Sequence, residues 1–119
     1  MAKIAVLMFS DASQANLARG FHALLLTKQF HQGGIEVRLI FDGAGTGWIT
    51  ALSDPEHRLH GLFNEVKGLG LVGGVCHYCS GRYSDPALVE KEGLALLGEA
   101  EGHPDIARLV KEGYQLLTL

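Results

Sequence analysis

Hydrophobic residues along this chain form two kinds of pattern, short unbroken runs and longer stretches with helical spacing. The short runs contain few polar residues, which is typical of strands buried on both faces of a parallel sheet. One run is different because Glu36 and Arg38 interrupt it, so one face of that strand is expected to be partly exposed. The pattern predicts five strands, at residues 3–9, 35–41, 71–75, 94–97 and 114–119.

The longest helical pattern lies in the first gap between these strands. Ser13 is a suitable N-cap for this helix, and Gly33-Gly34 is expected to end it. The apolar positions expected to pack on the sheet are Leu17, Phe21, Leu24 and Leu25. We therefore place Leu25 on the buried face of this helix.

Each remaining gap also contains a predicted helix. A short helix is expected within residues 43–52, after a glycine-rich turn. Asp54-Pro55 and Asp85-Pro86 each combine an N-cap residue with proline at the first helical position, so each predicts a helix start. The last helix is expected to begin at Pro104, with three residues facing inward: Ile106, Leu109 and Val110.

Strands that alternate with helices through short loops require right-handed crossovers between parallel neighbours. The expected fold class is α/β, a three-layer α/β/α domain with a five-stranded, mainly parallel sheet. The 119 residues show no internal repeat or linker, so we expect a single domain over residues 1–119. The carboxyl ends of the strands should share one edge of the sheet, where α/β proteins bind ligands.

The charge and hydropathy of the chain argue against two classes of partner. The net charge is −3, and the ten Lys and Arg residues are scattered, so binding to nucleic acid is not expected. A membrane partner is not expected either, because no apolar run approaches the roughly 18 residues of a transmembrane helix. The N-terminal run is too short for a signal peptide, and we expect a cytoplasmic protein.

The segment from Val75 to Arg82 holds both cysteines of the chain. Cys76 is expected at the carboxyl end of the third strand, and Cys79 completes a C-x-x-C pattern. In a reducing compartment such a pair indicates redox, sulfur or metal chemistry rather than a structural disulfide. We expect a reactive Cys76, with Arg82 and the following helix lowering its pKa and His77 as a candidate for proton transfer.

Histidines elsewhere offer a metal-binding alternative. His57 and His60 lie three residues apart and could complete a zinc site with Cys76 and Cys79 or with His77. This spacing is weakly specific, and solvated surface histidines are the interpretation that we favour.

Carboxylates and glycines also follow the predicted strands. Asp11, Asp42 and Glu99 could act as acid–base groups, although carboxylates at strand ends are more often caps and turn formers. The segment 43–47 could cradle an anion with its backbone amides, but a tight turn is the simpler interpretation.

Cys76 at the end of the third strand, the helix after it and Arg82 six residues later together resemble the DsrE/DsrF-like family of small sulfur-relay proteins. The similarity extends to the opening strand Ile4-Ala5-Val6-Leu7 and to the strand ending Ile40-Phe41-Asp42-Gly43, and it covers nearly the whole chain. The resemblance implies a DsrE-like domain that assembles into trimers or hexamers. It also implies a sulfane sulfur carried as a persulfide on Cys76.

The expected function is therefore a cysteine-based sulfur relay or thiol redox protein with a persulfide on Cys76 and Cys79 as resolving thiol. The alternative is a non-catalytic, oligomeric module of the same fold that binds a ligand or metal. No cofactor and no metal are assigned. The expected partners are sulfur donor and acceptor proteins or small thiols. Further copies of the chain are also expected, since Trp48 and Phe63 are predicted near uncovered apolar surface.

Overall fold

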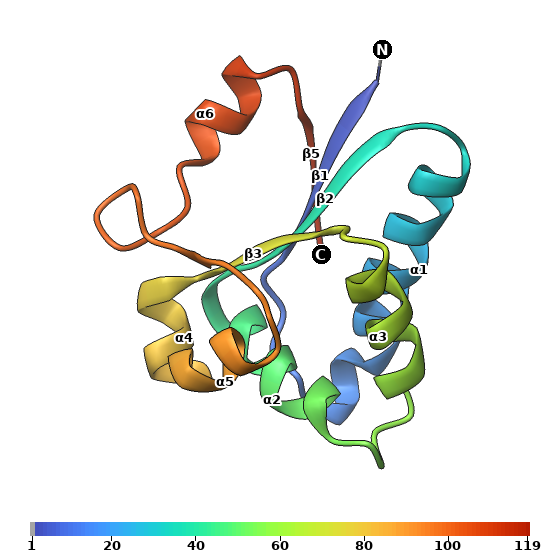
Figure 1. Cartoon of the computed structure of the whole chain (residues 1–119), viewed down its shortest axis with the longest axis vertical. Coiled ribbons are helices and arrows are strands. Elements are labelled where there is room, and N and C mark those ends of the chain that lie inside the picture. The colour runs from blue at the N-terminus through green and yellow to red at the C-terminus, as the bar shows by residue number, and fades with distance from the viewer. Residues whose placement is uncertain (1) are drawn as a thin grey trace.

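The computed structural model describes residues 2–119, which form one five-stranded sheet with helices on both faces (Figure 1). All neighbouring strands are parallel, in the order β4-β3-β2-β1-β5. Their bounds are β1 Lys3–Met8, β2 Glu36–Phe41, β3 Val72–Cys76, β4 Leu96–Leu97 and β5 Gln115–Thr118. The expected three-layer α/β/α class is confirmed.

Helices fill every gap between the strands. Two short 3₁₀ helices, η1 Gln14–Asn16 and η2 Gly43–Gly47, lead into α1 Leu17–Gln32 and α2 Trp48–Ser53. The remaining helices are α3 His60–Gly68, α4 His77–Tyr83, α5 Pro86–Lys91 and α6 Ile106–Lys111. Across residues 2–119, none of these helices has the length and apolar character needed to cross a bilayer.

The strand order decides which face of the sheet each helix covers. From β1 to β4 every new strand is added on the same side, so right-handed crossovers place α1, α2, α3 and α5 on one face (Figure 1). The connection from β4 returns across the sheet to β5, which puts α6 on the opposite face. The chain therefore leaves the neighbouring strands β3 and β4 toward opposite faces, an arrangement that opens a ligand-binding crevice in α/β sheets.

Most of the apolar core lies between the sheet and the layer formed by α1, α2, α3 and α5. Trp48 and Phe63 are fully buried there, so neither of them contributes to an exposed apolar surface. The Trp48 indole donates a hydrogen bond to the Ser10 carbonyl at 2.8 Å. Gly20 makes room for the ring, because a Cβ at that position would lie 2.4 Å from Trp48 Cη2.

The start and the buried face of α1 differ from the expectation. Ser13 makes no side-chain capping bond; instead its amide donates to Asp11 Oδ1 at 3.1 Å, and η1 precedes the helix. Leu24 is buried in the main core, whereas Leu25 is only half-buried and Phe21 is exposed. The placement of Leu25 on the buried face was wrong. Its neighbour Leu24 points to the core, and successive residues of a helix point about 100° apart around the axis.

The segment after α2 is a turn rather than the start of a helix. The amide of Glu56 donates to Asp54 Oδ1 at 2.9 Å, and the amide of His57 donates to the Asp54 carbonyl at 3.0 Å. An aspartate that bonds its own backbone two residues on favours a turn, so α3 begins only at His60.

The last helix is also shorter than predicted. Asp105 is its N-cap, bonding the Arg108 amide at 3.1 Å, so the helix starts at Ile106 instead of Pro104. Leu109 is buried against the sheet, but Val110 is 54% exposed, which corrects its expected inward direction.

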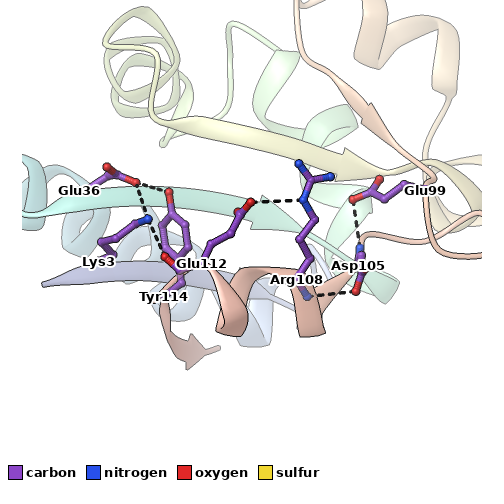
Figure 2. Close-up of polar contacts among 7 residues, drawn as sticks. All are labelled: Lys3, Glu36, Glu99, Asp105, Arg108, Glu112 and Tyr114. Carbon is purple, nitrogen blue, oxygen red and sulfur yellow. Dashed lines mark hydrogen bonds and ion pairs between the residues drawn. The ribbon is translucent and has the colours of Figure 1, made fainter.

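A network of polar contacts covers the face of the sheet that carries α6 (Figure 2). The Tyr114 hydroxyl donates to the Glu36 carboxylate, and Lys3 lies 3.7 Å from the same carboxylate. Arg108 pairs with Glu112 at 3.3 Å along α6. Beside this network, a groove of about 300 Å³ that is open to solvent lies between α6 and the sheet.

Candidate functional site

Two glycines in the first half of β3, Gly73 and Gly74, shape the strand before it reaches Cys76. Leu39 pairs with Val72 and Ile40 with Gly74, so Gly73 is an extra residue, a β-bulge. Gly74 has a φ of +152°, and a Cβ there would lie 2.5 Å from Leu97 Cγ on β4. Bulges of this kind re-aim the residues that follow them and are common beside functional sites.

Cys76 is the last residue of β3 and the N-cap of α4, as the sequence predicted. Its side chain is fully buried, and its sulfur accepts a hydrogen bond from the Cys79 amide at 3.5 Å. Cys79 is partly exposed, both cysteines are free, and their sulfur atoms lie within 4.8 Å of each other. The two thiols can therefore approach each other with only small movements.

His103 joins the cysteines from the loop after β4. Its Nδ1 lies 3.2 Å from Cys76 Sγ and 3.9 Å from Cys79 Sγ. A tight turn presents it, in which the Ala100 amide donates to the His103 carbonyl at 2.9 Å. Glu101 and Gly102 have φ values of 56° and 90°, as both central residues of a type I′ turn require.

His103 was not predicted from the sequence, because it lies 27 residues after Cys76 in a polar loop. Knowledge of the strand order would have pointed to His103. Because β3 and β4 are parallel neighbours, the loops that follow them lie side by side. Two contacts hold the loop there. The Tyr78 amide donates to the Gly102 carbonyl at 2.9 Å, and the Tyr78 ring lies 5.1 Å from the His103 ring.

Asp42 completes the group from the end of β2. The residue is only 8% exposed, and its Oδ1 accepts a hydrogen bond from the Gly43 amide at 2.7 Å. Thr46 ties this turn to α4, since its hydroxyl lies 2.9 Å from the Gly43 carbonyl and 3.1 Å from the Cys79 carbonyl. Within residues 2–119 Asp42 forms no ion pair. We call Asp42, Cys76, Cys79 and His103 the cysteine cluster.

The environment of Cys76 changes its acidity in the direction opposite to the one expected. Burial raises the pKa of the Cys76 thiol to about 12, and the negative charge of Asp42 adds to the increase. The hydrogen bond from the Cys79 amide acts in the other direction but is outweighed. The thiol is thus protonated at neutral pH, and the expectation of a lowered pKa was wrong.

Arg82 and His77, the other two site residues expected from the sequence, lie on the exposed side of α4. The Arg82 guanidinium faces the Tyr83 ring at 5.8 Å and is not among the groups that shift the pKa of Cys76. His77 packs against Gly98, where its Nδ1 would be 3.4 Å from an added Cβ. Helical geometry turns Cys79 inward and these two residues outward.

The remaining candidates have structural roles. His57 packs edge-on against Trp48, and the Nδ1 of His60 lies 2.7 Å from the Leu52 carbonyl, so neither belongs to the cysteine cluster. Asp11 bonds Ser13 and Asn16 in a turn, and Glu99 accepts the Asp105 amide at 3.1 Å. Segment 43–47 forms the tight turn expected of it, in which a Cβ at Gly45 would lie 1.9 Å from the Met8 carbonyl.

Fold and site together define a parallel α/β/α protein with two thiols, an imidazole and a carboxylate at the carboxyl edge of its sheet. No protein-family model matches the chain. It is 28% identical over 119 residues to the uncharacterized protein MJ0733 of Methanocaldococcus jannaschii, covering 98% of this chain and 95% of that one.

Among solved structures, the conserved protein of unknown function BT1422 from Bacteroides thetaiotaomicron has a TM-score of 0.65 and 12% sequence identity. The match covers 97% of this chain and 94% of that one. At this identity the likeness supports the fold alone.

Proposed function

We propose that this protein is a cysteine-based sulfur relay or thiol redox protein that carries a persulfide on Cys76. The observation that carries the proposal is the contact of 3.2 Å between Cys76 Sγ and His103 Nδ1, beside a second free thiol. A thiol paired with an imidazole and a neighbouring thiol are the parts that nucleophilic sulfur chemistry requires.

His103 takes the role of the base in this proposal, in place of His77, and the proposal gives no role to Arg82. A neutral imidazole with a free Nδ1 lone pair accepts the proton of Cys76 and leaves a thiolate beside an imidazolium. The positive imidazolium then offsets the charge of Asp42, which adds to the effect of burial in keeping the Cys76 thiol protonated. Cys76 is therefore inert at rest and reactive when His103 holds its proton.

The first chemical step is the transfer of sulfane sulfur from a persulfide donor. The Cys76 thiolate attacks the outer sulfur of the donor, the new sulfur–sulfur bond forms, and the bond inside the donor breaks. The donor leaves as a thiolate and takes the proton held by His103. This step involves no net oxidation, because a persulfide is exchanged for a persulfide.

Cys79 provides the second step, since its sulfur lies within 4.8 Å of Cys76 Sγ. Attack of the Cys79 thiolate on Cys76 Sγ forms a disulfide and expels hydrosulfide, so the sulfane sulfur is reduced by two electrons and the dithiol is oxidised. Two equivalents of a small thiol then reduce the disulfide through a mixed disulfide and leave joined as their own disulfide. Attack on the outer sulfur by an acceptor thiol instead passes the sulfur on.

Because Cys76 is buried, a sulfur donor must be small or must insert a narrow group into the site, and a donor with a broad, flat surface would not reach the sulfur. Cys79 and His103 are half-buried and form the approach to the fully buried Cys76 sulfur. We propose a cytoplasmic location for this chemistry, because free thiols persist in reducing compartments.

We further propose a homo-oligomer, a trimer or hexamer, as the DsrE-like resemblance implies. Since Trp48 and Phe63 are buried, support now comes from other exposed apolar residues, Leu116 on β5 and Val110 on α6. Sedimentation at micromolar concentration tests this assembly, and a monomer would contradict it.

Intact-protein mass spectrometry after exposure to a persulfide donor tests the function. The wild-type chain should gain single sulfur atoms or a disulfide, and Cys76→Ser should gain no persulfide. Cys79→Ser should accumulate the persulfide, because its intramolecular exit is removed. His103→Asn should slow the reaction, while the surface control Arg82→Ala should leave it unchanged. A chain in which neither thiol gains sulfur would refute the proposal.

A further inference from the structure

We propose that the cysteine cluster is a zinc-binding site. One ligand atom from each of Asp42, Cys76, Cys79 and His103 lies within 4.8 Å of the other three. It is the one group of three or more potential metal ligands with this proximity in the part of the chain that the structure describes. The four residues lie at or after the carboxyl ends of the neighbouring strands β2, β3 and β4, so the strand order brings them together.

The spacing of these atoms matches tetrahedral zinc. Bonds of about 2.3 Å to sulfur and about 2.0 Å to nitrogen or oxygen give ligand–ligand separations of roughly 3.3 to 3.8 Å. His103 Nδ1 lies 3.2 Å from Cys76 Sγ and 3.9 Å from Cys79 Sγ, values close to that range. Small side-chain rotations are enough to place all four atoms around one ion.

The donor set selects zinc over other common metals. Two sulfurs, one imidazole nitrogen and one carboxylate oxygen are the ligand types that zinc accepts together. Magnesium and calcium require oxygen ligands. Iron–sulfur clusters are held by four thiolates or, in Rieske centres, by two thiolates and two imidazoles, whereas the cysteine cluster offers two thiols and one imidazole.

Charge provides an independent reason for a cation. Asp42 is more than nine-tenths buried beside two thiols, and none of the ion pairs found in residues 2–119 involves it. Arg82, the nearest arginine in sequence to the cysteines, faces Tyr83 instead. A buried carboxylate without a cationic partner is costly, and a divalent ion at the cluster would remove that cost.

Backbone contacts already orient the ligands. The Gly43 amide holds Asp42 Oδ1, and the Cys79 amide points at Cys76 Sγ, where it stabilises a thiolate. Outer contacts of this kind fix ligands in metal sites. Binding requires no redox partner: one zinc ion displaces the protons of two thiols, so up to two protons are released for each ion bound.

Zinc and sulfur would compete for the same thiols. A metal-bound form has neither thiol free, so zinc occupancy would block the sulfur chemistry proposed for Cys76. Zinc binding nevertheless requires only the four side chains, and it would stand even if neither thiol accepted sulfur.

The test uses the full chain, reduced and freed of metal, titrated with Co²⁺ and then with Zn²⁺. We expect one Co²⁺ per chain, with the visible absorption of a tetrahedral ion and thiolate-to-cobalt charge transfer. One equivalent of Zn²⁺ should then remove both bands. Competition with a chromophoric chelator measures the affinity for Zn²⁺.

Single substitutions identify the ligands. Cys79→Ser and His103→Ala should each weaken zinc binding by at least about 100-fold, and Asp42→Asn by about 10- to 100-fold. His77→Ala is the matched control, because it removes an exposed histidine from the same segment, and it should change nothing. Circular dichroism verifies that each variant is folded.

Two results would overturn the zinc site. One is a folded, reduced wild-type chain that shows no thiolate-to-cobalt band at stoichiometric Co²⁺. The other is a Zn²⁺ affinity that persists in both Cys79→Ser and His103→Ala, or that is lost in His57→Ala. The persulfide assay on the same samples keeps the two proposals apart, since sulfur uptake without zinc binding refutes only the metal site.

Discussion

The cysteine cluster and the polar network on the α6 face differ in how their charges are compensated. On the α6 face every carboxylate in the network has a donor, and most of these side chains reach solvent (Figure 2). In the cysteine cluster a buried carboxylate lies beside two thiols without a cationic side chain. Exposed, paired charges stabilise a protein only slightly.

The difference separates two uses of polar residues. The α6 network lies on the less covered face of the sheet, where one helix of six residues packs over a small apolar core. The cysteine cluster keeps polar groups buried at a cost, which proteins accept mainly where chemistry or binding depends on them.

The largest effect should be the suppressed reactivity of Cys76. In metal-free Cys79→Ser protein, alkylation of Cys76 at pH 7 should be at least about 100-fold slower than in the unfolded chain. Below the pKa, each unit by which the pKa is raised lowers the fraction of thiolate about tenfold. With a pKa of about 12, the native rate should keep rising beyond pH 10. A plateau near pH 8.5, measured by mass spectrometry, would show that burial does not control this thiol.

Asp42→Asn should increase the alkylation rate of Cys76 by about tenfold at pH 8, because the negative charge of Asp42 contributes to the raised pKa. Glu99→Gln is the matched control, since it neutralises a carboxylate at the end of a neighbouring strand that bonds Asp105 instead. Equal rates in Asp42→Asn and wild type would remove Asp42 from the electrostatics of the site.

On the α6 face, Tyr114→Phe should have a smaller effect that depends on pH. The hydrogen bond from Tyr114 lowers the pKa of Glu36, so its contribution to stability is present above the unfolded value near 4.5 and is lost as pH falls below it. Urea denaturation should therefore show a smaller loss of stability between neutral and acidic pH in the variant. An identical acid dependence in both proteins would contradict this assignment.

Arg108→Ala should have the smallest effect, below about 0.5 kcal/mol in the free energy of unfolding, because its ion pair with Glu112 is exposed. The difference should shrink further at 1 M salt, where exposed charges are screened. A cost above about 1 kcal/mol would mean that the α6 network contributes more to stability than its exposure suggests.

Much of the fold could be predicted from the sequence because it depends on local patterns. Short, mainly apolar runs predicted all five strands, and the strand that ends at Cys76 placed that residue at the correct edge of the sheet. The prediction was wrong where the same side-chain hydrogen bond can either cap a helix or stabilise a turn. Asp54 was expected to cap a helix, but it forms a turn with Glu56.

The sequence by itself determined the α/β class and the two thiols, since hydrophobic spacing and residue chemistry are properties of short segments. Only the tertiary structure decided the order of the strands, and with it the meeting of Cys76 with His103 from the loop after β4. It also decided that Asp42, rather than Asp11 or Glu99, faces the thiols. Burial and charge at Cys76 arise from residues distant in sequence, so the direction of its pKa shift follows from the packed structure alone.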